Sequence, residues 1–318
     1  MYKNKKVLLI AGGGTLGTYT AEELLRLGAE VDVLCPEDKI SDNDKLRFIK
    51  GLGNEDTLKK LFEKEHYNGI VNFIHYPDVE DYKKIHHFLS DNTEHLIFLF
   101  SYRVYADEMH PIREDAPMLL DVSDDKEFLE KEDYALSKAK AEYYLRNESE
   151  TSNWTAVRPV ISFSKYRFDI VTINQQTVIE KAKSGEKILL PIKAKNLTAG
   201  LDWAGNSGKL IANLLFKPET FGESFTISSA QNITWGQMAD YYTELLGTEF
   251  EWVSTEEFIK SGGTPYGNWA LFYDRLYDRK IDNSKVLRAT GLKSEDFISI
   301  KEGIKIELDK IAVKYKAE

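Results

Sequence analysis

Short apolar runs alternate with amphipathic segments through the first half of the chain. The runs at 7–10, 69–74 and 95–100 are apolar at nearly every position. Segments between such runs, including 18–27 and 55–65, repeat apolar residues at the spacing of an α-helix. Because strands that are apolar on both faces need helices on both sides, the pattern predicts a parallel sheet in a doubly wound α/β fold. Further strands are expected at 30–35, 48–51 and 154–158, and further helices at 79–89 and 128–146.

The regular alternation loosens after Pro159, which helps to end the strand at 154–158. Beyond it we expect helices at 170–183, 204–215, 235–246 and 294–316, with short strands at 188–191 and 224–227. A boundary between two domains is expected where regular alternation stops. We therefore place a first domain at 1–162, to which 197–216 returns, and a smaller mixed domain at 163–318.

Composition and charge disfavour several classes of protein. No apolar run approaches the roughly 20 residues of a membrane span, so we expect no membrane protein. The net charge of −10 disfavours a nucleic-acid partner, because chains that bind phosphate backbones present basic faces. Cys35 is the only cysteine, so no intrachain disulfide can form, which is compatible with the cytoplasmic location that we expect. No spacing of His, Cys, Asp or Glu predicts a metal site.

A glycine-rich turn follows the first strand. Three of its glycines fit G-x-G-x-x-G, and a strand before it and a helix after it are the context that this motif needs. Glycines let the backbone approach a pyrophosphate, and the N–H groups of the helix N-terminus point toward it. We therefore expect 1–162 to be a dinucleotide-binding domain, although such a turn can also merely join strand and helix. The expected cofactor contacts here are Ala11, Gly12, Gly13, Gly14, Thr15, Leu16 and Gly17.

A tyrosine and a lysine stand four positions apart in the helix expected at 128–146. Tyr134 and Lys138 therefore face one side of that helix. A nearby ammonium favours the phenolate form of tyrosine, so the phenol can exchange a proton with a hydroxyl or carbonyl near neutral pH. Ser101 follows the strand at 95–100, and ligands of such sheets bind at the carboxyl ends of the strands. We expect all three in one crevice with the glycine turn, whereas the tyrosine–lysine spacing alone also fits an exposed helix pair.

Further motifs occur in an order typical of one enzyme family. They are V-Y at 104–105, E-D-A-P at 114–117, R-P at 158–159, L-D-W-A at 201–204 and T-W-G-Q-M at 234–238. Together with the glycine turn, Ser101 and the Y-x-x-x-K of Tyr134 and Lys138, they resemble the extended or atypical short-chain dehydrogenases/reductases of the NAD-dependent epimerase/dehydratase type. The resemblance covers essentially the whole chain.

The resemblance implies a Rossmann-type domain with a smaller C-terminal substrate domain. It also implies an oxidoreductase, epimerase or dehydratase that uses NAD to transfer hydride on a sugar nucleotide or related polyol, with a homodimer left open. Within it, Ser101 fixes the substrate oxygen, Tyr134 moves the proton, and Lys138 both activates Tyr134 and orients the cofactor ribose. Tyr105 and Arg167 are the expected substrate contacts, whereas residue preference alone fits Arg167 equally well to a surface arginine before a helix.

The chain departs from the family pattern around the cofactor. Ala11 stands at the family's first glycine, and Leu52 replaces the aspartate that contacts adenine. The acidic residue expected at the end of the second strand is Cys35, with Glu37 just beyond, and we expect both to contact the cofactor. Because no basic residue occurs at 35–38, the sequence favours NAD, while nearby Lys39 leaves NADP open.

Two hypotheses in which the protein catalyses no reaction stay open beside the hypothesis of an enzyme. The chain also resembles, more distantly, the chloroplast stem-loop RNA-binding branch of the same fold, in which the fold serves RNA rather than hydride transfer. Retention of Ser101, Tyr134 and Lys138 favours chemistry, and the acidic net charge disfavours RNA. A regulator that senses the cofactor is the other alternative.

Overall fold

The computed structural model describes residues 2–131, 134–265 and 267–316, without the side chains of 312–316. Its centre is a seven-stranded sheet in which all neighbouring strands run parallel, in the order β10-β6-β5-β4-β1-β2-β3. The chain therefore has the predicted doubly wound, Rossmann-type α/β fold. The strands are β1 (Lys6–Ile10), β2 (Glu30–Cys35), β3 (Leu46–Lys50), β4 (Tyr67–Asn72), β5 (Thr93–Leu99), β6 (Trp154–Pro159) and β10 (Glu223–Ile227).

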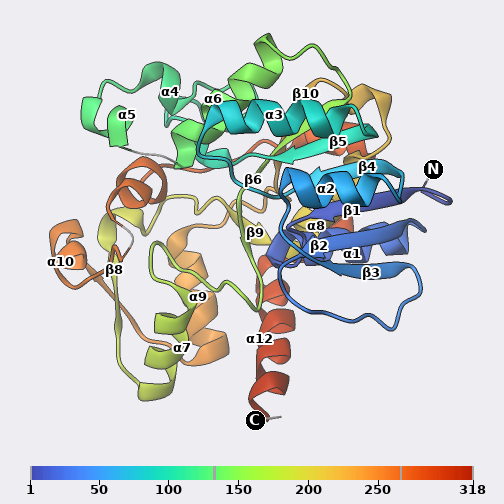
Figure 1. Ribbon diagram of the computed structural model, residues 1–318. Helices are drawn as coiled ribbons and strands as arrows, with labels where there is room; N and C mark the ends of the chain where they lie inside the picture. The colour runs from blue at the N-terminus through green and yellow to red at the C-terminus, as the bar shows by residue number, and fades with distance from the viewer. Residues whose placement is uncertain (1, 132–133, 266, 317–318) are drawn as a thin grey trace.

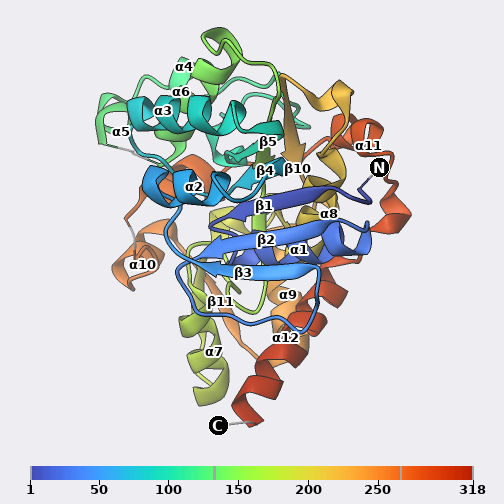
Figure 2. The same ribbon diagram turned by 45° about the vertical axis from the view of Figure 1, so that its right-hand side comes forward.

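Helices cover both faces of this sheet (Figure 1, Figure 2). Alternate residues of β1 explain the two layers, since Val7 and Leu9 belong to one apolar core and Leu8 and Ile10 to the other. The first core also holds residues of α1 and α8, which pack against each other. The second core holds residues of α2, α3 and α6. These helices are α1 (Thr15–Arg26), α2 (Glu55–Phe62), α3 (Val79–Ser90), α6 (Tyr134–Asn147) and α8 (Ala204–Leu214).

The remaining elements gather mainly around a third apolar core, and α7, α9 and α12 lie in the lower part of Figure 1. Two small parallel pairs, β7 with β9 and β8 with β11, replace a large sheet here. No helix among the described residues is long and apolar enough to cross a membrane. The bounds are α4 (Leu119–Val122), α5 (Lys126–Lys131), β7 (Ile161–Phe163), α7 (Gln175–Ser184), β8 (Ile188–Pro191), β9 (Leu201–Trp203), α9 (Trp235–Leu246), β11 (Phe250–Val253), α10 (Thr255–Lys260), α11 (Ser284–Thr290) and α12 (Ile300–Lys316).

Local hydrogen bonds moved some helix starts away from the predicted positions. The helix expected at 170–183 begins only after Asn174, whose side chain caps the backbone N–H of Thr177, because Ile170 pairs with Ile173 in a short bridge before it. The helix expected at 128–146 is described as α5 and α6, and 132–133 lie outside the described residues. The C-terminal helix begins at 300 rather than 294, after a short 3₁₀ turn.

Candidate functional site

The glycine turn joins β1 to α1 with very close packing. A Cβ atom at Gly17 would lie 2.2 Å from the carbonyl oxygen of Gly12, and one at Gly12 would lie 2.7 Å from the Cβ of Leu9. Both positions therefore require glycine for packing within the protein. A Cβ at Gly14 would meet nothing within 4 Å, so this residue faces open space at the start of α1.

Ala11 adopts a backbone conformation that favours glycine. Its φ of +56° lies in the left-handed region, which costs a residue with a Cβ roughly 1–2 kcal/mol. The methyl group is exposed and lines the cavity described next. The alanine that departs from the family pattern thus keeps the backbone shape that the turn needs, at the expense of local strain.

A cavity of about 450 Å³ opens above the glycine turn. It lies at the carboxyl ends of β1 and β5, beside the point where the strand order reverses between β1 and β4. Open α/β sheets bind their ligands at such switch points. The structure therefore brings together residues from at least five separate segments, including Ala11, Gly14, Thr15, Leu16, Gly17, Ser101, Arg103, Tyr134, Arg167 and Arg275.

Ser101 and Tyr134 line this cavity from different elements. Ser101 stands two positions after Leu99, the last residue of β5, and caps the 3₁₀ turn at Tyr102–Val104, where its Oγ accepts the N–H of Arg103 at 3.2 Å. Tyr134 is the first residue of α6. Its ring packs edge-on against His75, with ring centroids 5.0 Å apart, and the Arg103 guanidinium lies 5.0 Å from its centroid.

Lys138 stands one helical turn after Tyr134; it does not line the cavity but contacts Leu99 and Phe100, which do. Its Nζ donates to the carbonyl of Leu99 at 2.6 Å and to that of Ile74 at 3.5 Å, at the ends of β5 and β4. The side chain is 4% exposed. Burial lowers the pKa of Lys138 to about 7, because the low-dielectric surroundings disfavour its ammonium form.

The end of β2 lies beside the glycine turn, as the motif predicts. The Cys35 Sγ donates to the carbonyl of Glu37 at 3.6 Å, and burial raises the pKa of the Cys35 thiol, which keeps it protonated. A Cβ at Gly13 would lie 2.9 Å from a carboxylate oxygen of Glu37. The Nζ of Lys39 donates to the carbonyl of Gly13 at 2.8 Å. An acidic and a basic side chain therefore both reach the turn.

Tyr105 does not line the cavity, contrary to the role expected from the sequence. Its side chain is fully buried, and its hydroxyl contacts Arg158 at 2.5 Å and Thr226 at 2.6 Å. Arg158 in turn forms a completely buried ion pair with Glu142. We therefore correct the substrate contact to a structural role, because these hydrogen bonds use the phenol inside the core.

Arg167 lines the cavity, and its role as a substrate contact stays a prediction. Its Nε pairs with Asp169 at 2.7 Å, and its side chain is 43% exposed. It also lines a second cavity of about 430 Å³ that adjoins the first. Both cavities are lined by Thr15, Arg103, Arg167 and Arg275.

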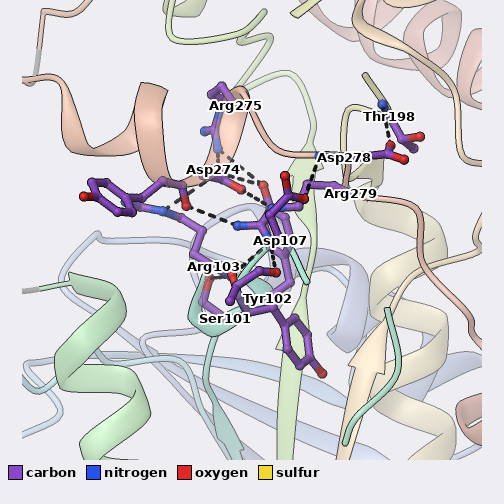
Figure 3. Close-up of polar contacts among 12 residues, drawn as sticks. Ser101, Tyr102, Arg103, Asp107, Thr198, Asp274, Arg275, Asp278 and Arg279 are labelled. Atoms are coloured by element: carbon purple, nitrogen blue, oxygen red, sulfur yellow. Dashed lines mark hydrogen bonds and ion pairs between the residues drawn. The ribbon is translucent and has the colours of Figure 1, made fainter. Parts of the chain in front are cut away.

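Sequence reasoning missed Arg103 and Arg275. Both contact the buried carboxylate of Asp274, Arg103 at 3.9 Å and Arg275 directly (Figure 3). The sequence could have indicated Arg103 as a site residue, because it stands two positions after Ser101, beyond the end of β5. No sequence pattern indicates Arg275, because only the tertiary fold brings it to Tyr102. Within the described ranges, no three His, Cys, Asp or Glu side chains gather as a metal site would need.

Comparisons with known proteins support the fold. No protein-family model and no curated protein matches the chain. The epimerase Mth375 from Methanothermobacter thermautotrophicus is similar, with a TM-score of 0.74 at 16% identity, over 99% of this chain and 94% of that one. WbmG from Bordetella bronchiseptica, solved with NAD, gives a TM-score of 0.67 at 17% identity, over 96% and 93%. UDP-glucose 4-epimerase from Thermotoga maritima, solved with UDP-glucose, gives 0.68 at 13% identity, over 98% and 99%. At these identities the comparisons confirm the predicted Rossmann-type α/β fold.

Proposed function

We propose that this protein is an NAD-dependent epimerase, dehydratase or reductase that acts on a sugar nucleotide or related polyol. One observation carries the proposal: Gly14, Ser101 and Tyr134 line a single cavity at the switch point of the sheet, beside the buried Lys138. Solved proteins of the same fold include complexes with NAD and with UDP-glucose. In this proposal 1–162 binds mainly the cofactor and 163–318 mainly the substrate.

The residues at the turn fit a dinucleotide. Gly14 has no side chain in the way of a pyrophosphate, and no side chain caps the first N–H groups of α1. Those N–H groups and the positive end of the helix favour an anion. The Glu37 carboxylate beside Gly13 suits a ribose hydroxyl and opposes a 2′-phosphate. When bound, NAD would accept or return the hydride that this class of reaction needs.

The chain's own residues would handle the proton. Tyr134 would take it from, or return it to, the substrate oxygen that Ser101 holds by a hydrogen bond. Lys138 would favour the phenolate form of Tyr134 and donate to ribose hydroxyls from its position at the ends of β4 and β5. The edge contact with His75 and the Arg103 guanidinium would keep the Tyr134 ring in place.

Two measurements test the proposal. Calorimetry on the full chain should show NAD binding, and a screen of sugar nucleotides should then find turnover. Tyr134→Phe should lower kcat by about 10²–10⁴, the usual contribution of general acid–base catalysis, and leave NAD affinity within about twofold. The matched control is Tyr143→Phe, which removes an exposed hydroxyl from the same helix and should change neither quantity.

The outcomes separate the alternatives. A protein without NAD affinity would not be a dinucleotide enzyme. NAD binding with no turnover on any substrate would favour a cofactor-sensing role. Full activity of Tyr134→Phe would refute the proposed proton transfer even if the rest of the proposal held.

A further inference from the structure

Arg103 and Arg275 stand where the two cavities adjoin. The first cavity holds Ser101 and Tyr134, and the second extends over the C-terminal elements. A substrate that reaches the candidate proton-transfer groups from the second cavity passes these two guanidinium groups. They come from distant segments, since Arg103 follows β5 and Arg275 ends the π-helix Leu271–Arg275. Short π-helical turns occur frequently at functional sites.

Arg275 is built firmly into the wall of this junction. Its residue is only 6% exposed, yet it lines both cavities. Its Nε donates to the carbonyl of Val171 at 2.8 Å, and its Nη1 donates to the hydroxyl of Tyr102 at 3.3 Å. The guanidinium is therefore held in one orientation before any ligand arrives, which lowers the entropic cost of binding.

Arg103, Arg275 and Arg279 gather around the buried carboxylate of Asp274 (Figure 3). The Asp274 carboxylate is shared, because Arg275 contacts one side of it and the Nε of Arg279 contacts the other at 3.0 Å. The pKa of Arg275 falls to about 10, mainly because of burial; the charges of Arg103 and Arg167 also lower it, whereas Tyr102 and Asp169 raise it. A buried guanidinium under such conditions gains from an additional anion.

Arg103 places this positive charge beside the candidate reaction centre. Its guanidinium lies 5.0 Å from the ring centroid of Tyr134, and its backbone N–H donates to the Oγ of Ser101. An anionic group held by Arg103 would therefore lie within a few bonds of a substrate hydroxyl at Ser101 and Tyr134. A planar guanidinium suits the paired oxygens of a carboxylate or phosphate.

We propose that Arg103 and Arg275 form a subsite for an acidic group, a carboxylate or a phosphate, attached to the sugar or polyol close to its reacting carbon. This inference rests on the proposed function and specifies its substrate class. It differs from recognition of a remote diphosphate, because the arginines adjoin the proton-transfer residues. The substrate is then an acidic or phosphorylated sugar rather than a neutral one.

The test compares ligands that differ only in the acidic group. Calorimetry with saturating NAD measures Kd for UDP-glucuronate against UDP-glucose and for glucose 6-phosphate against glucose, so that a carboxylate and a phosphate are probed separately. We expect the acidic member of at least one pair to bind at least about tenfold more tightly, as for a hydrogen-bonded charge. Arg103→Gln should remove this preference and leave the neutral member within about twofold.

Three further variants keep the test decisive. Arg103→Lys retains the charge and should keep part of the preference. Arg113→Gln changes an exposed, ion-paired arginine outside both cavities and should alter no affinity. Arg275→Met should act like Arg103→Gln, provided that its melting temperature shows a folded protein.

The failures of the two proposals are distinguishable. If neither pair shows an acidic preference, the subsite is overturned, whereas NAD binding with turnover of a neutral sugar nucleotide would leave the proposed function intact. If Arg103→Gln weakens UDP-glucose as much as UDP-glucuronate, the junction holds the diphosphate, and the inference of an acidic sugar is also wrong.

Discussion

The buried lysine beside the cavity makes a quantitative prediction about stability. Among the described residues, Lys138 hydrogen-bonds to the carbonyls of Leu99 and Ile74 and to no carboxylate. We expect Lys138→Met to stabilise the fold near neutral pH, because methionine fills a similar volume without a charge. The same change should weaken NAD binding if the ammonium holds the ribose.

The magnitude follows from the lowered pKa. The pKa of Lys138 is about 7 in the folded protein, and that of an unfolded lysine is about 10.4. The difference corresponds to roughly 5 kcal/mol, at about 1.4 kcal/mol per unit, and the two carbonyl contacts make this an upper bound. Between pH 7 and about 10 the unfolded state binds more protons, so the stability of the unmodified protein rises with pH.

The prediction therefore concerns the difference in unfolding free energy between Lys138→Met and the wild-type protein, which decreases as the pH rises. The extra stability of Lys138→Met should be largest at pH 7 and below, and should fall by up to about 1.4 kcal/mol per pH unit toward pH 10. Urea unfolding followed by tryptophan fluorescence at pH 6, 7, 8 and 9 measures it, where unfolding is reversible. Taking the difference cancels other titrating groups. Lys140→Met, which changes an exposed lysine of the same helix, should show no such trend.

A pH-independent difference, or a loss of stability in Lys138→Met at pH 7, would refute this account of the buried ammonium. Either result would mean that the folded protein compensates the charge of Lys138 as well as water does. The low pKa of Lys138 would then no longer support its proposed role in binding ribose, and that role would need other evidence.

Three further predictions concern the cofactor turn. Gly14→Val should weaken NAD binding by at least roughly tenfold, because the new side chain takes the space of the pyrophosphate. The melting temperature should not fall, because that space is open in the protein, and unchanged NAD affinity by calorimetry would contradict a dinucleotide at the turn. Ala11→Gly should raise the free energy of unfolding by about 0.5–1 kcal/mol in urea, because it relieves the positive φ; a decrease would show that the methyl group stabilises the turn. NAD should bind more tightly than NADP, because Glu37 lies at the turn; tighter NADP binding that Lys39→Met abolishes would show that Lys39 holds a 2′-phosphate instead.

The fold could be predicted from sequence because its signals are local. Apolar runs mark the strands, and the glycine spacing marks a turn where a Cβ at Gly17 would collide with Gly12. The start of α7 was harder to predict from sequence, because the pairing of Ile170 with Ile173 competes with helix formation. The helical period alone continues through such a bridge, so it placed the helix five residues too early.

The candidate site was only partly predictable for the same physical reason. Ser101, Tyr134 and Lys138 occur in motifs whose spacing carries their chemistry, and the structure places them at or beside one cavity. Tyr105 occurs in an equally clear motif, yet its surroundings are decided by Arg158 and Thr226, which are 53 and 121 residues away. A motif therefore gives the residue type but not the direction in which the side chain points.

In the proposed function, substrate selection depends on the part of the chain that is hardest to predict from sequence. Arg275 reaches Tyr102 across 173 residues, and the π-helix that carries it has no sequence pattern comparable to the glycine turn. The motifs of the first domain describe how a proton and a dinucleotide are handled, which many substrates share. The C-terminal segment adds Arg275 where the two cavities adjoin. A substrate assigned only from resemblance in the first domain would therefore leave out Arg275, which we propose helps to select the substrate.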